Sequence, residues 1–158
     1  MSNVLIGIIG VVLFIGLALA GALFLGPRFQ ESTNNSRAAA SIQAVSQISS
    51  AANMFNVQEG RIVALDTGVT ELATTGYLKS VPTNPTNGTA PALVEFDDMI
   101  AGPDAVEMVL TDNAEAVCDA IAKQTGTETA AGTAPDARPA GPAGCYDNAG
   151  AFTAFARI

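Results

Sequence analysis

Two cysteines, Cys118 and Cys145, are the side chains of this chain best suited to covalent chemistry. If the chain crosses a membrane into an oxidising compartment, an even number of cysteines indicates a disulfide before any other role. Closing the loop between these two would remove roughly 3.6 kcal/mol of conformational freedom from the unfolded chain. The alternative is a pair of unrelated buried thiols, which would behave as small hydrophobic side chains.

Carboxylates in the second half of the chain form an acidic cluster that could bind calcium, because calcium prefers oxygen ligands. Its members are Asp97, Asp98, Asp104 and Glu107. Their spacing is not that of an EF-hand, so a solvated acidic surface is the better interpretation. The sequence has no histidine, which removes the commonest general base and the commonest metal ligand together. We therefore expect no enzymatic activity, no metal site and no cofactor.

The charge balance limits the partners of the chain. Its 15 acidic and 7 basic residues give a net charge of −8. Such a chain is not expected to bind nucleic acid directly, since phosphate contacts need Lys and Arg. The sequence also has no Lys/Arg cluster that would attract anionic lipid headgroups.

The longest element that the sequence predicts is an apolar helix at the N-terminus. Val4 to Leu25 are apolar or glycine, and the first charged residue is Arg28. This helix would span roughly 33 Å, close to the hydrocarbon thickness of a bilayer. It has no polar stripe, so it must lie in lipid, belong to a cleaved signal, or pack in a bundle of its own copies.

The residues that flank the run argue against a cleaved signal. Met1-Ser2-Asn3 carries no Lys or Arg, and the apolar run is longer than the hydrophobic region of a signal peptide. We expect that a basic leader once preceded Met1 and was removed, and that the apolar helix was retained. Gly26 and Pro27 predict a kink or an unwound stretch at its end.

An amphipathic helix is predicted to follow, from about Pro27 to Gln58, and to stop at Gly60. Its apolar residues recur at steps of three and four: Ala38, Ile42, Val45, Ile48, Ala52 and Phe55. The chain thus divides into an apolar half-helix, residues 1–27, and a unit of residues 28–158 in which the amphipathic half-helix packs on a globular head.

The head is predicted to have an α+β fold with a small antiparallel sheet. A helical turn at 69–75 and a helix from 112 to about 124, capped by Asp112 and Glu115, supply the helical part. A loop rich in Ala, Gly, Thr and Pro at 125–144 should be exposed. The expected strands are 61–65, 92–96 and 105–111, followed by a closing hairpin of 144–147 and 151–158.

Four features together resemble a mature type IV pilin. They are the apolar half-helix, its amphipathic continuation, a loop that follows this long helix, and the two C-terminal cysteines. That loop is Gly76-Tyr77-Leu78-Lys79-Ser80-Val81-Pro82-Thr83-Asn84-Pro85. The second helix around Cys118 is more similar to the type IVb and conjugative-plasmid pilins.

The resemblance implies a long helix whose apolar half protrudes and whose amphipathic half packs on the head. It implies a leader cut by a prepilin peptidase, methylation at Met1, and a disulfide between Cys118 and Cys145. The chain would cross the inner membrane once, and the pilus assembly machinery would then extract it into an extracellular homopolymeric filament. The residues expected to pack in the filament core are Val4, Leu5, Ile8, Ile9, Val12, Leu13, Leu17 and Phe24.

One residue departs from the pattern of the family. Most bacterial pilins carry a glutamate at the fifth mature position, thought to neutralise the N-terminal amine of a neighbouring subunit, and this chain has Leu5. The amine of Met1 then needs another partner, for which oxygens of Ser2, Asn3 or the backbone are candidates.

Two alternative functions stay open at the level of sequence. A pseudopilin of a type II-like secretion system would share the fold and form short periplasmic assemblies. A monomeric membrane-anchored periplasmic binding module would keep its basic leader and would not polymerise.

Overall fold

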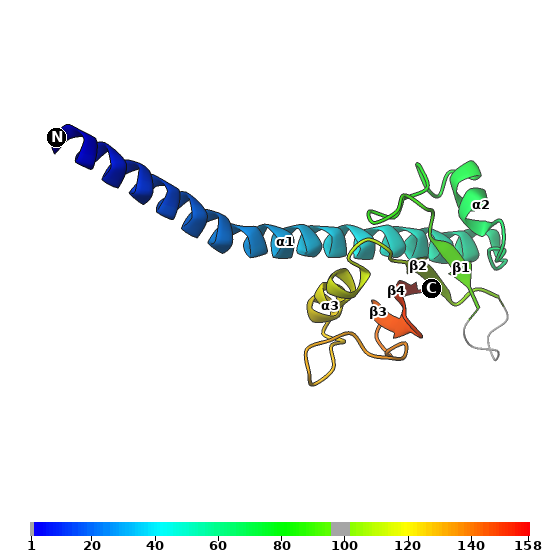
Figure 1. Ribbon diagram of the computed structural model, residues 1–158. Coiled ribbons are helices and arrows are strands. Elements are labelled where there is room, and N and C mark those ends of the chain that lie inside the picture. The colour runs from blue at the N-terminus through cyan, green and yellow to red at the C-terminus, as the bar shows by residue number, and fades with distance from the viewer. Residues whose placement is uncertain (1, 96–101) are drawn as a thin grey trace. The chain divides into compact units, whose positions relative to one another are not determined.

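The computed structural model of the chain describes residues 2–95 and 102–158, and in α1 it leaves the side chains of residues 2, 3, 24 and 25 undescribed (Figure 1). The fold is α+β, as the sequence predicts. Its elements are α1 (Ser2–Glu59), α2 (Gly68–Thr74), β1 (Ala92–Val94), β2 (Ala105–Val109), α3 (Ala114–Thr125), β3 (Ala143–Asn148) and β4 (Ala151–Arg157).

The chain forms two compact units, and the boundary between them lies within α1. Unit 1 is Met1–Thr33 and unit 2 is Asn34–Ile158, whereas the sequence analysis places the division after residue 27. Unit 2 contains a four-stranded antiparallel sheet in the order β1-β2-β4-β3.

The α1 segment of unit 2 supplies the helical side of the hydrophobic core. Ala38, Val45, Ile48, Ala52 and Phe55 are all fully buried and recur at the predicted helical spacing. They pack with α3 and with one face of the sheet, to which β2 contributes Val106 and Met108. The predicted packing of an amphipathic half-helix on a small sheet is therefore confirmed.

The C-terminal end of α1 is set by a glycine and a side-chain hydrogen bond. Gly60 adopts a φ of +65°, a left-handed conformation that glycine takes without steric cost and that ends the helix. Asn56 Oδ1 then accepts a hydrogen bond of 3.0 Å from the amide of Val63, which holds the chain as it turns back. The end at Glu59 agrees with the predicted stop at Gly60.

Gly26 and Pro27 do not unwind the helix. α1 continues through both residues, so the unwound stretch that the sequence allows is not seen, and the kink stays a prediction. A proline inside a helix lacks one amide donor and conflicts with one carbonyl, here that of Leu23.

Two smaller predictions are wrong. Residues 61–65 form no strand, because this segment returns past the end of α1 and pairs with none of the described strands. Asp112 does not cap α3. The N-cap is Asn113 in a left-handed conformation with a φ of 51°, and its side chain makes no capping hydrogen bond.

The loop between α3 and β3 covers the face of the sheet opposite to α1. On this face Tyr146 and Phe155 pack edge to face, with ring centroids 6.0 Å apart. Arg138 from the loop lies over the ring of Phe155, with Cζ 4.9 Å from its centroid. The loop was predicted to be exposed along its whole length. That prediction is wrong for residues 134–135 and 138–139, which are buried or half-buried.

Candidate functional site

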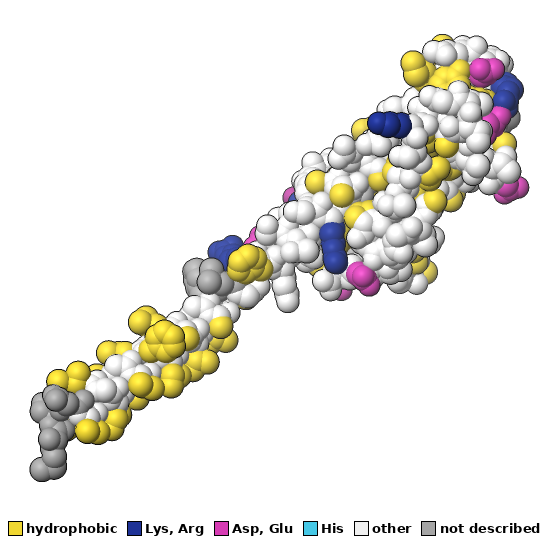
Figure 2. Space-filling view, turned by 90° about the horizontal axis from the view of Figure 1, so that it is seen from above, with side chains coloured by type: hydrophobic (Ala, Val, Ile, Leu, Met, Phe, Trp, Pro, Cys, Tyr) yellow, Lys and Arg dark blue, Asp and Glu magenta, His cyan; other side chains and the backbone are white. Residues whose placement is uncertain are grey.

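The first candidate for a functional surface is the helix of unit 1 between Val4 and Leu23, which is apolar on every side. Between Val4 and Leu23 the large hydrophobic side chains are exposed, from 51% at Ile15 to 78% at Leu23. Figure 2 shows these side chains along the helix, with no charged side chain among them. The predicted core-packing residues Val4, Leu5, Ile8, Ile9, Val12, Leu13 and Leu17 all belong to this surface.

This helix is long and apolar enough to cross a membrane, with a mean hydropathy of 2.8 and none of the span buried within the chain. Each large side chain would contribute about 1.5–3 kcal/mol when removed from water. A single helix cannot bury all of its own sides, so the surface requires lipid or other chains around it.

The glycines of unit 1 are not needed by the packing of the chain itself. A Cβ added at Gly7, Gly10, Gly16 or Gly21 would meet no atom within 4 Å. At Gly7 the missing side chain leaves an open apolar groove of about 430 Å³ between Val4, Ile8 and Val11. Small residues on an apolar helix allow a neighbouring helix to approach closely.

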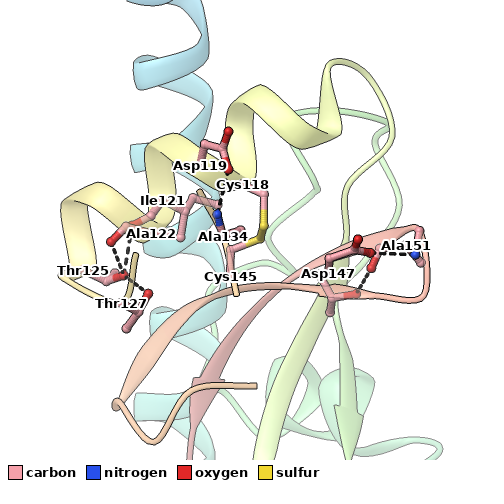
Figure 3. Close-up of a disulfide and its surroundings, with 12 residues drawn as sticks. Cys118, Asp119, Ile121, Ala122, Thr125, Thr127, Ala134, Cys145, Asp147 and Ala151 are labelled. Atoms are coloured by element: carbon pink, nitrogen blue, oxygen red, sulfur yellow. Dashed lines mark hydrogen bonds between the residues drawn. A yellow bond between two sulfur atoms is a disulfide. The ribbon is translucent and has the colours of Figure 1, made fainter. Parts of the chain in front are cut away.

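The disulfide between Cys118 and Cys145 is present and fully buried, which confirms the predicted pairing. It joins the middle of α3 to β3, with the two Cα atoms 5.4 Å apart (Figure 3). Beside it, the amide of Ala134 donates a hydrogen bond of 2.8 Å to Asp119 Oδ1, and the amide of Asp147 donates one of 2.9 Å to the carbonyl of Pro135. Together these contacts fix α3, the loop and the hairpin to one another.

The loop that carries the resemblance is a docked part of the head. Leu78 is buried, and its amide donates to the carbonyl of Leu72. Asn84 is only 2% exposed, and its Nδ2 donates a hydrogen bond of 2.6 Å to the carbonyl of Val109 at the end of β2. Its Oδ1 accepts from the amide of Thr86 at 2.9 Å. Asn84 thus ties this loop to the sheet, a structural role.

A buried tyrosine on the loop-covered face of the sheet was not found by sequence reasoning. The hydroxyl of Tyr146 donates a hydrogen bond of 2.8 Å to Glu107 Oε1 across the sheet. Burial raises the pKa of Tyr146 well above its ordinary value, and the hydrogen bond and negative charge of Glu107 raise it further. The positive charge of Arg138 opposes this shift. The alternation of residues in β3 could have placed Tyr146 on a different face from Cys145, but not beside Glu107.

The raised pKa of Tyr146 predicts a loss of stability in alkali. Below about pH 10 the hydroxyl is protonated in both states, and above it the unfolded chain ionises first. The free energy of unfolding should therefore fall by up to about 1.4 kcal/mol per pH unit above pH 10. A Tyr146→Phe variant should lose about 1 kcal/mol at neutral pH and show a shallower alkaline slope.

Denaturant unfolding between pH 7 and pH 11.5 measures how the free energy of unfolding depends on pH in the wild-type protein and in the variant. Some slope should remain in the variant, because burial and a hydrogen bond with Glu59 also raise the pKa of Tyr77. Equal slopes in the two proteins would contradict the assignment to Tyr146.

The acidic cluster predicted from sequence is only partly within the described residues. Asp97 and Asp98 lie outside them, as does Met1, the expected site of methylation, and the side chain of Phe24 is not described. Glu107 accepts the hydrogen bond of Tyr146, and the backbone carbonyl of Asp104 accepts one from the amide of Ile158. Among the residues that the structure describes, no three His, Cys, Asp or Glu side chains are grouped to hold a metal ion.

Comparison with known proteins gives no relative from which a function could be transferred. No protein-family model, no curated protein and no solved structure matches this chain. The surface of unit 1 and the disulfide-linked head are therefore the features that bear on function.

Proposed function

We propose that this chain is the structural subunit of an extracellular type IV pilus-like filament, assembled through the helix surface of Val4–Leu23. The observation that carries the proposal is that this surface is apolar on every side and is attached to a disulfide-linked α+β head. A filament core built from many copies would bury all sides of the helix at once, and it would leave the heads in water.

One feature favours copies of the chain over lipid as the final surroundings of this helix. Its glycines leave open space that the same chain does not fill, and at Gly7 this space is an apolar groove. The membrane would hold the subunit before assembly, and the pilus machinery would move it into the filament.

The nearest alternative is a pseudopilin of a type II-like secretion system, which the same helix and head would suit. A monomeric membrane-anchored binding module is favoured by one observation, the length and hydropathy of α1. In such a module lipid alone would fill the groove at Gly7, and the head would need a ligand site.

Intact-mass measurement of the native protein distinguishes the filament subunit from the anchored module. The proposal predicts a chain that begins at Met1 and carries one additional methyl group, since prepilin processing removes the leader and methylates the new terminus. A native chain that keeps a basic leader and has no methyl group would contradict the proposal and favour the anchored module.

A further inference from the structure

The outward face of α1 in unit 2 is unusual for the surface of a chain with a net charge of −8. No charged residue occurs between Arg37 and Glu59. The exposed residues of this stretch are small, amide-bearing or apolar, and they include Met54 and Val57 at 54% and 84% exposure. Depletion of charge is typical of the buried centre of a protein interface and not of an ordinary solvated helix.

This face contains an open groove of about 450 Å³. Its floor on α1 is formed by Gln43, Ser46, Gln47, Ser50 and Met54, and its other wall is formed by residues 77–79. Lys79 is the only charged residue that lines it, and its side chain is exposed. The groove therefore offers amides, hydroxyls and apolar side chains, with one positive charge.

An exposed surface with similarly little charge lies elsewhere in unit 2, at the tip of the loop that follows α3. The tip, residues 127–133, consists of Thr, Ala and Gly with one charged residue, Glu128. In the described part of the chain, neither Glu128 nor Lys79 takes part in an ion pair.

The tip is held in one shape before it meets a partner. The amide of Thr129 donates to the carbonyl of Thr133, and the amide of Gly132 donates to the carbonyl of Thr129, both at 2.9 Å. At its base the hydroxyls of Thr125 and Thr127 lie 2.9 Å apart (Figure 3). A loop that is already ordered loses little conformational entropy on binding.

We propose that the tip of one copy, residues 127–133, docks in the Gln43–Met54 groove of a second copy, with Glu128 pairing with Lys79. Both surfaces are uncharged apart from these two residues of opposite sign, so two strongly acidic chains can approach there without repulsion. The inference rests on the proposed function and names the contact between heads.

The positions of the two surfaces fit a repeating contact. The groove extends towards the end of α1, where Tyr77 donates hydrogen bonds to Gln58 and Glu59. The tip follows α3, whose Gln124 donates to the carbonyl of Asn35 near the start of the same helix segment. Two different patches of one chain that bind each other leave a free patch at either end, which produces an open helical polymer unless the ring closes.

Charge reversal in the full-length chain tests the contact. Lys79→Glu and Glu128→Lys should each raise the critical concentration for polymerisation roughly fivefold at low salt, and the double variant should return it to near the wild-type value. Sedimentation after detergent dilution gives this concentration. The matched control is the pair Glu115→Lys and Lys123→Glu on α3, which should change it less than about twofold.

A zero-length cross-link gives an independent readout. Carbodiimide treatment of polymers made from mixed light and heavy-isotope chains should join Lys79 of one copy to Glu128 of another, seen as a mixed-isotope peptide pair. Absence of either the rescue or this inter-copy link overturns the contact, even if filaments form normally. A wild-type chain that forms no polymer overturns both the contact and the proposed function.

Discussion

A Leu13→Lys variant is expected to form no filaments while its head folds normally. Leu13 lies in the middle of the apolar helix with its side chain 62% exposed. Unit 2, which contains the head, is compact by itself. A lysine in the centre of a bundle of apolar helices would be an unpaired buried charge, which costs several kcal/mol in each subunit. Because every subunit carries the change, the polymer should be lost and not merely weakened.

The loss can be separated from a failure to enter the membrane. One lysine at the centre of a membrane helix costs about 2.5–3.5 kcal/mol in insertion, and the remaining apolar residues of α1 offset this. The variant should therefore be found in the membrane fraction with its disulfide formed. Leu13→Met, which keeps the volume and adds no charge, is the control and should give normal filaments. Filaments of ordinary length from Leu13→Lys, seen by electron microscopy, would contradict assembly through this helix.

Removal of the disulfide should give the largest loss of stability in the head. A Cys118→Ala/Cys145→Ala double variant is expected to unfold with a free energy lower by about 3.6 kcal/mol, since the unfolded chain regains the freedom of the closed loop. The loss is a large fraction of the 5–15 kcal/mol that typically stabilises a domain. Chemical denaturation in detergent, followed by circular dichroism, measures it.

Reduction of the wild-type protein is the matched comparison, because it opens the same bond and keeps both sulfur atoms. Its mass should rise by two hydrogens and its stability should fall to near that of the double variant. Secondary structure should persist in both, because α3 and β4 still share the core through Val117 and Ala154, and β3 stays paired with β4. A loss smaller than about 1 kcal/mol would show that the bond does not constrain the head.

The long-range plan of the fold follows from patterns that are local in the sequence. The steps of three and four from Ala38 to Phe55 define the buried face of α1, and the left-handed φ of Gly60 ends it. The closing hairpin was predictable because Asn148 and Gly150 are typical turn residues between two short strands, and Gly150 takes a positive φ in the turn. Such signals act through neighbouring residues, so no knowledge of the rest of the fold is needed.

The features that sequence reasoning missed depend on contacts between distant segments. Arg138 packs on Phe155 because the loop before β3 crosses the sheet, and nothing in the Ala/Gly/Pro-rich loop indicates that path. Residues 61–65 have the composition of a strand but are held by Asn56 instead of by a strand partner. The residues that form the surface of unit 1 were predictable, because an uninterrupted apolar run is visible in the sequence without knowledge of its contacts. What covers that surface lies outside this chain, so the sequence does not specify it.

Electron cryomicroscopy of the protein isolated from its native source tests the central proposal most directly. The account predicts helical filaments in which the Val4–Leu23 helices of many copies form a continuous core and the heads form the outer surface. Chains found only as single copies in membranes, with the same helix surrounded by lipid, would contradict it.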